Sequence, residues 1–163
     1  MPENRKTEGL ALNRSVEDNV VLAGLRRLFP RRWYFFRAAA IVAQDIVSRL
    51  RIATSSITRL TRYLSGGNQQ KVVIGKWFAA NSRLFIFDEP TRGIDVGAKA
   101  EIYGVIEKLV ADGAAVLMIS SELPEMVAVC DRAYVMRDRK IVGELGRADL
   151  SEANILKLAM HHD

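Results

Sequence analysis

From residue 64 onward, short apolar runs alternate with segments of helical periodicity, and this alternation limits the folds open to the chain. Runs of four to six apolar residues have the length of a buried strand, whereas apolar residues at every third or fourth position are typical of a helix. Buried strands separated by helices favour a mostly parallel sheet covered on both faces. The predicted elements are helix 68–80, strand 83–88, helix 96–111, strand 115–120, helix 122–129, strand 132–137, strand 140–145 and helix 149–160.

The first 63 residues differ in kind, because they are predicted to be helical and rich in arginine. Ser15, followed three residues later by Asp18, forms a variant of the capping box and opens a helix. We expect this helix to run to about Leu28 and to be ended by Pro30. The other features predicted here are a helical stretch over 33–50 and a break in the Ser/Thr-rich segment 54–61.

Charge is distributed unevenly along the chain. Residues 1–63 carry 12 basic and 5 acidic side chains, and residues 64–163 carry 12 and 14. The densest basic run, 26–37, interleaves five arginines with leucine and aromatic side chains. This composition is compatible with a nucleic-acid or anionic-lipid surface, and equally with a helix whose arginines face solvent and whose aromatic side chains face a core or a protein neighbour.

The overall composition, with 49% hydrophobic and 26% charged residues, argues for a folded globular chain and against intrinsic disorder. The longest uninterrupted apolar run, 38–43, is far shorter than the roughly 18 residues of a membrane-spanning helix. The single cysteine, Cys130, cannot form an internal disulfide, so we expect a reducing, cytoplasmic setting.

The apolar run Leu84–Phe87 ends in two adjacent carboxylates, those of Asp88 and Glu89. Ligand sites in parallel α/β sheets lie beyond the carboxyl ends of the strands, where these side chains are expected. An acidic turn after a buried strand is common, however, so the pattern gains its weight from two neighbouring segments, 64–71 and 90–95.

Ser65 is expected to cap a helix whose first amides belong to Gly66 and Gly67. The two glycines leave these N–H groups unobstructed at the positive end of the helix dipole, which suits them to bind phosphate. Taken alone, Ser-Gly-Gly is also compatible with a plain N-cap after a loop. No comparable structural explanation accounts for the order and spacing of the whole octapeptide, the strand that ends in Asp-Glu, and the Gly-Ile-Asp turn at 93–95.

In this order, the motifs resemble those of the ATP-binding cassette (ABC) family. Residues 64–69 match its signature motif, 84–89 its Walker B strand and 93–95 its D-loop. The octapeptide, together with segments 2–10 and 88–99, is similar to the second cassette of the tandem-cassette sugar importers of the ribose, galactose and xylose type. The resemblance covers nearly the whole chain and is loosest between residues 25 and 60.

The resemblance implies part of a P-loop NTPase fold of the α/β class. Residues 1–80 would hold the end of the core lobe and the helical signature subdomain, and residues 81–163 the Walker B, D-loop and switch part of the catalytic core. It also implies ATP and Mg²⁺ as cofactors and a peripheral location on the cytoplasmic face of the bacterial inner membrane. The implied partners are a second cassette, transmembrane permease subunits and, indirectly, a sugar-binding protein, with no nucleic acid.

For the site residues, the resemblance implies a site divided between two cassettes. Ser65 and Gly67 would hydrogen-bond the γ-phosphate of an ATP held by the opposite cassette. Asp88 would hold Mg²⁺ through water, and Glu89, the catalytic residue, would orient or deprotonate the attacking water. The remaining nucleotide-binding residues implied are Leu64, Gly66, Gln69 as a support of the signature loop, Asp95 as a link across the cassette interface, and Ser121 at the switch position.

Two departures from the family pattern qualify these expectations. No Gly-x-x-x-x-Gly-Lys-[Ser/Thr] loop occurs in the sequence, and Met1 falls where the lobe that carries this loop ends in the family. Ser121 stands where the family usually has a histidine, and serine cannot carry the proton of an imidazole. The resemblance implies that second cassettes of this branch often share that serine. His161 and His162 are not expected to be catalytic.

From the missing loop we expect that the chain alone binds ATP poorly and does not hydrolyse it. We also expect that the absence of the neighbouring strand leaves two buried strand edges unpaired.

The function that we expect is that of a cassette fragment powering ATP-dependent sugar import and donating its signature motif to a partner cassette. The alternative is a non-catalytic relic or regulatory module that only binds a partner cassette or permease. A nucleic-acid-associated ABC ATPase, suggested by the arginine run, is the weakest hypothesis, because no long heptad insertion occurs and the turn 92–95 resembles that of importers.

Overall fold

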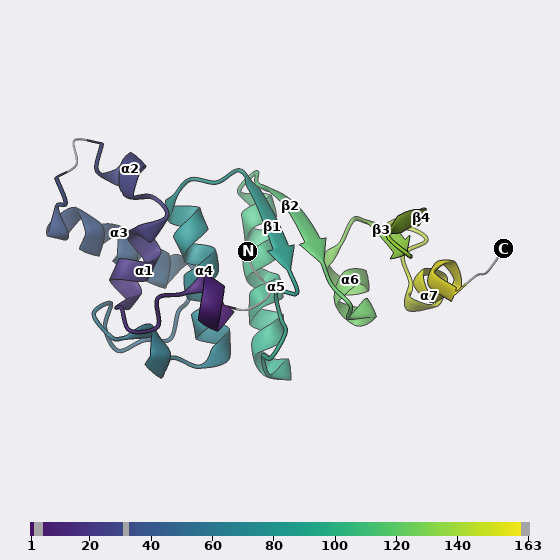
Figure 1. The fold of residues 1–163 in the computed structure, drawn as a ribbon, viewed down its shortest axis with the longest axis horizontal. Coiled ribbons are helices and arrows are strands. Elements are labelled where there is room, and N and C mark those ends of the chain that lie inside the picture. The colour runs from purple at the N-terminus through teal and green to yellow at the C-terminus, as the bar shows by residue number, and fades with distance from the viewer. Residues whose placement is uncertain (2–4, 31–32, 161–163) are drawn as a thin grey trace. The chain divides into compact units, whose positions relative to one another are not determined.

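The computed structural model describes residues 1, 5–30 and 33–160, which form two compact units (Figure 1). Unit 1 is Met1–Ile119 and unit 2 is Ser120–Asp163. The two units are defined by the contacts between their residues. The predicted division into residues 1–80 and 81–163 rests on the order of the sequence motifs, and it stays a prediction. Segment 2–4 of the family resemblance, and the tail histidines His161 and His162, lie outside the described residues.

The order of elements agrees closely with the sequence prediction from residue 64 onward. In unit 1, a π-helical turn (Arg5–Gly9) is followed by α1 (Val16–Leu22), α2 (Leu25–Leu28), α3 (Phe36–Arg49), a 3-10 turn (Thr61–Tyr63), α4 (Gly66–Ala79), β1 (Leu84–Asp88), α5 (Val96–Ala111) and β2 (Ala115–Ile119). In unit 2 the order is α6 (Leu123–Val129), β3 (Arg132–Arg137), β4 (Lys140–Gly146) and α7 (Glu152–Met160). None of the described helices is long and apolar enough to cross a membrane.

Helix α1 begins with the predicted capping box. The Ser15 hydroxyl accepts a hydrogen bond from the Asp18 N–H at 3.0 Å, and the Asp18 carboxylate accepts one from the Ser15 N–H at 3.2 Å. The prediction of one continuous helix to Leu28 is wrong, because α1 ends at Leu22 and α2 begins after Gly24. A Cβ at Gly24 would lie only 3.3 Å from the Ala79 carbonyl, so the glycine permits a close approach to the end of α4.

Helix α4 is the centre of unit 1, and α1, α3 and α5 all pack against it (Figure 1). Val72, Val73 and Ile74 are completely buried. Gly75 allows α3 to come close, since a Cβ at this position would lie 2.5 Å from Ile46 Cγ2.

Strands β1 and β2 form a parallel pair in the register Leu84↔Ala115 to Asp88↔Ile119. The single crossover helix α5 connects them and packs against β2. Phe85 and Phe87 are buried on one face of the pair, whereas Leu84 and Ile86 on the other face are about half exposed.

The prediction that helices cover both faces is therefore wrong for this pair. Strand β2 pairs with β1 alone among the described residues. The expected unpaired edge is therefore present at β2 in this part of the chain, but its residues are exposed or half-buried instead of buried.

In unit 2, β3 and β4 form an antiparallel hairpin. Its two-residue turn, Asp138 and Arg139, has φ values of 50° and 64°, as a type I′ turn requires. Helix α7 packs on the hairpin around Ala133, Val135 and Ile155. The α/β class is thus confirmed, but the described strands form one parallel and one antiparallel pair instead of a single mostly parallel sheet.

Two glycines provide a matched test of the packing around α4. We expect Gly75→Ala to lower the free energy of unfolding by about 1–3 kcal/mol, because the added methyl group overpacks the contact with α3. Gly104→Ala, in a helix position with no atom within 4 Å of the added Cβ, should raise it by about 0.4–1 kcal/mol. Urea titration followed by fluorescence measures both, and no loss in Gly75→Ala would contradict the close packing.

Candidate functional site

The predicted signature residues lie at the N-terminus of α4, where Ser65 is exposed, Gly66 is half-buried and Gly67 is buried. Ser65 has the extended backbone of an N-cap, and its hydroxyl accepts hydrogen bonds from the Asn68 N–H at 3.4 Å and the Asn68 Nδ2 at 2.8 Å. The side chain of Asn68 also accepts a hydrogen bond from the Ala53 N–H at 2.7 Å. The first N–H groups of α4, those of Gly66 and Gly67, have no partner within the helix and lie at its positive end.

The two glycines are also required by close packing. A Cβ at Gly67 would lie 2.7 Å from the Ala98 side chain of α5, and a Cβ at Gly66 would lie 2.8 Å from Arg5 Nη2. Leu64, just before the cap, is buried and anchors the segment. The glycines therefore have a packing role in addition to the predicted one of leaving the N–H groups accessible.

Polar side chains of α4 bind the backbone of nearby loops. Gln69 Nε2 donates to the Thr61 carbonyl at 3.2 Å, and its role as a support of the signature loop stays a prediction. Gln70 Nε2 donates to the Pro90 carbonyl at 2.6 Å, and both partners are buried. Gln70 thus holds the turn that follows β1.

Asp88 and Glu89 lie at the carboxyl end of β1, as predicted. The Asp88 N–H donates to the Met1 carbonyl at 3.2 Å, and the Glu89 N–H donates to the Ile119 carbonyl, at the end of β2, at 2.8 Å. Glu89 has a φ of 48°, in the left-handed region. For a residue with a Cβ this conformation costs about 1–2 kcal/mol, and such strain is concentrated at functional sites.

The turn between β1 and α5 ends at Asp95, which caps α5. Asp95 Oδ1 accepts a hydrogen bond from the Ala98 N–H at 2.9 Å. The same turn passes next to the start of α4, since a Cβ at Gly66 would lie 3.5 Å from the Gly93 carbonyl oxygen. The structure therefore brings residues 65–67 together with the turn that leads to Asp95, and it places Asp88 and Glu89 at the other end of that turn.

Ser121 lies in unit 2, apart in the chain from the other predicted residues. Its neighbour Ser120 organises the start of α6, where the hydroxyl accepts a hydrogen bond from the Glu122 N–H at 3.0 Å and donates to the Glu125 carboxylate at 2.5 Å. Glu125 is 2% exposed, so this hydroxyl satisfies a buried carboxylate. No sequence pattern gave Ser120 a role.

Arg5 and Gln70 were missed as well. Both donate to backbone carbonyls of the turn after β1, and Arg5 does so across 87 and 88 positions of sequence. The position of Gln70 just before the apolar run Val72–Ile74 was an available signal, because a buried amide needs a partner. Arg5 lies in segment 2–10 of the family resemblance, but no local pattern gave it a role.

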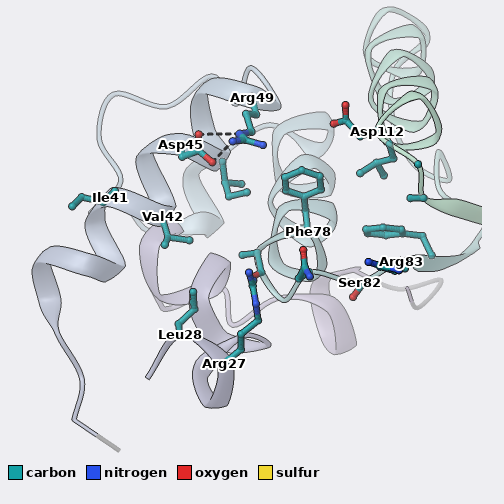
Figure 2. Close-up of a pocket in the computed structure, with 17 residues that line it drawn as sticks. Arg27, Leu28, Ile41, Val42, Asp45, Arg49, Phe78, Ser82, Arg83 and Asp112 are labelled. Atoms are coloured by element: carbon teal, nitrogen blue, oxygen red, sulfur yellow. Dashed lines mark hydrogen bonds and ion pairs between the residues drawn. The ribbon is translucent and has the colours of Figure 1, made fainter. Parts of the chain in front are cut away.

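A cavity of about 930 Å³ lies elsewhere in unit 1, beside α3 and the C-terminal ends of α4 and α5 (Figure 2). Figure 2 shows Asp45 and Arg49 paired on its wall, at 2.8 Å. None of the predicted site residues lines this cavity. Within the described part of the chain, no cluster of three or more His, Cys, Asp or Glu side chains could hold a metal ion.

Comparison with known proteins identifies the family. Residues 5–92, more than half of the chain, match the sequence profile of the ABC transporter family. The chain belongs to the ABC transporter family. The matched segment contains the capped end of α4, strand β1 and the first part of the turn that follows it.

The relatives of this ABC chain are named as import ATP-binding proteins. A Burkholderia lata protein named “Putative ribose/galactose/methyl galactoside import ATP-binding protein 1” is 47% identical over an alignment of 165 positions, which covers 100% of this chain and 32% of that protein. The ribose import ATP-binding protein RbsA of Yersinia pestis is 44% identical over 159 residues, which are 98% of this chain and 31% of that protein. The chain thus spans about a third of the length of these relatives.

Solved structures agree on the fold. A nucleotide-free ATP-binding cassette from an ABC transporter matches with a TM-score of 0.73 at 22% identity. The match covers 92% of this chain and 64% of that cassette. A metal-chelate type ABC transporter in an inward-facing conformation has a TM-score of 0.78 at 17% identity, covering 91% and 59%. The predicted fold, part of an ABC nucleotide-binding domain of the P-loop NTPase class, is confirmed.

The contact of Gln70 with the turn gives a direct test. Gln70→Glu keeps the shape but replaces the donating NH₂ group with an oxygen that faces the Pro90 carbonyl. We expect it to lower the free energy of unfolding by about 1–3 kcal/mol, because the buried carbonyl loses its donor.

The matched control is Gln44→Glu, on the exposed side of α3, which should change stability by less than about 0.5 kcal/mol. Urea titration of the two variants provides the comparison. Equal losses would mean that the Gln70 contact does not stabilise the turn.

Proposed function

We propose that this chain is part of the ATP-binding subunit of a sugar importer and that it supplies residues 64–69 to an ATP held by a partner cassette. The observation that carries the proposal is the serine-capped N-terminus of α4, where Ser65 is exposed and the first helical N–H groups lie beside the turn that leads to Asp95. The names of the relatives support ribose and related sugars as the transported class.

In this proposal, the start of α4 binds the γ-phosphate. The Ser65 hydroxyl and the Gly67 N–H donate hydrogen bonds where negative charge develops during phosphoryl transfer, and the helix dipole favours the same charge. Gln69 holds the loop from behind through the Thr61 carbonyl. Asp95 caps α5 and extends the interface toward the partner cassette.

In the same proposal, the carboxylates after β1 act on Mg²⁺ and on the attacking water, in a site that this chain shares with the partner cassette. The donor set fits a divalent cation, because Mg²⁺ prefers oxygen ligands and commonly retains water between itself and a carboxylate. Asp88 would hold Mg²⁺, which neutralises charge on the phosphates when bound, and Glu89 would orient or deprotonate the attacking water. Ser121 occupies the switch position with a hydroxyl group.

The sequence contains no phosphate loop, so a complete ATP site needs residues from outside this segment. We propose that the segment belongs to a second cassette and that its partners are another cassette and transmembrane permease subunits, at the cytoplasmic face of the inner membrane. Exposed aromatic side chains support a protein neighbour, since Trp33, Phe35 and Phe36 are each more than 60% exposed.

A substitution at the cap tests the signature role. In the complete importer, Ser65→Arg should abolish ATP-dependent sugar uptake, because the long cation replaces the hydroxyl and obstructs the phosphate-facing end of α4. Ser48→Arg, at an exposed serine of α3, is the control and should retain uptake. Uptake of labelled sugar into vesicles is the measurement, and unchanged uptake in Ser65→Arg would refute the assignment.

A second test concerns the 163-residue chain by itself. We expect the purified chain to release phosphate from ATP no faster than its Glu89→Gln variant, because no lysine-bearing loop holds the triphosphate. A phosphate-release assay at millimolar ATP and Mg²⁺ compares the two. Steady turnover above that of the variant would show that these residues form an ATPase without a partner.

A further inference from the structure

Arg5 binds the turn between β1 and α5 with both arms of its guanidinium group. Nη1 donates to the Arg92 carbonyl at 2.9 Å, and Nη2 donates to the Gly93 carbonyl at 3.1 Å. A planar guanidinium reaches two neighbouring carbonyls at once, which the single ammonium of lysine cannot do with the same geometry.

The same group lies against the first residue of α4. Arg5 Nη2 is 2.8 Å from the position that a Cβ of Gly66 would occupy, so a side chain there would displace the guanidinium. Arg5 thus lies between the start of the signature helix and the turn of the D-loop, two segments that the sequence separates by more than 20 residues, and adds to the direct approach of Gly66 to the Gly93 carbonyl.

Three unfavourable effects accompany this position of Arg5. Its Nε is buried with no hydrogen-bond partner in the described part of the chain, and burial lowers the pKa of the guanidinium from its ordinary value. A positive charge near the N-terminus of α4 is also disfavoured by the helix dipole. The two charge-assisted hydrogen bonds to the turn offset these costs, which indicates that the fork holds the side chain in place.

We propose that Arg5 is a positioning residue that fixes the turn 91–95 against the first residue of α4. The two segments then keep one relative arrangement, so that the signature residues and Asp95 face the partner cassette together. The meaning of this coupling for transport rests on the proposed function, whereas the coupling itself rests on the contacts of Arg5.

Hydrogen–deuterium exchange of the full chain tests the coupling. In Arg5→Lys, which keeps the charge and loses the fork, the amides of residues 91–95 should exchange about tenfold faster, the effect of losing one charge-assisted hydrogen bond. The amides of unit 2 should exchange as in the wild type, which excludes general destabilisation. Unchanged exchange in 91–95 would overturn the proposal.

Gly66→Ala provides a second, independent disturbance of the same contact. It should reproduce the faster exchange in 91–95, and Arg5→Lys combined with Gly66→Ala should exchange no faster than either single variant, because both remove the same interaction. Gly104→Ala, with open space around the added methyl group, is the control and should leave 91–95 unchanged. Additive effects of Arg5→Lys and Gly66→Ala would contradict the proposal.

The functional consequence is measured in the complete importer with its partners. Per folded molecule, Arg5→Lys should lower the kcat of ATP hydrolysis several-fold and leave KM within about twofold, because a positioning residue acts through the interface loops that its guanidinium binds. A change in KM with unaltered kcat would contradict the positioning role. If Ser65→Arg retains uptake, the proposed function fails, while the exchange experiment still decides whether Arg5 couples the two segments.

Discussion

The organisation of unit 1 depends on the burial of polar side chains along α4. A buried amide or ammonium group without a partner is costly, so each of these side chains must find an acceptor in the structure around it. The acceptors that they find are mostly backbone carbonyls of loops, those of Thr61 for Gln69, Pro90 for Gln70, Arg51 for Lys71 and Gly9 for Lys76. One helix therefore fixes the loops on several sides of unit 1, including both segments of the proposed site.

The turn after β1 is held from three directions. Gln70 of α4 binds its start, Arg5 binds its middle, and Glu89 is fixed by the end of β2. These contacts stabilise a backbone that includes positive φ values at Glu89 and Gly93. The strained conformation persists because the surrounding structure determines it more strongly than local preference does.

The sequence predicted the elements of this fold where the signal is local. Capping by Ser15, the helix at 96–111 and the strand at 132–137 follow from side-chain chemistry and periodicity, and the structure confirms them. It did not predict the interruption at Gly24, because the constraint on that glycine is its close approach to the Ala79 carbonyl at the end of α4, which is far away in the sequence. Two further features depend on which segments pack together in the folded chain: the exposed face of the β1–β2 pair and the contacts of Arg5. The local sequence pattern does not contain that information.

The two pairs of strands differ in how quickly they can form. The hairpin β3–β4 closes through two residues, Asp138 and Arg139, so its ends are close in the unfolded chain and pairing takes on the order of microseconds. The parallel pair must first fold the crossover helix α5, and its loop-closure entropy is larger. Because the Glu89 N–H binds Ile119 at the far end of that crossover, we expect the backbone around the carboxylates to reach its native geometry among the last parts of the chain to do so.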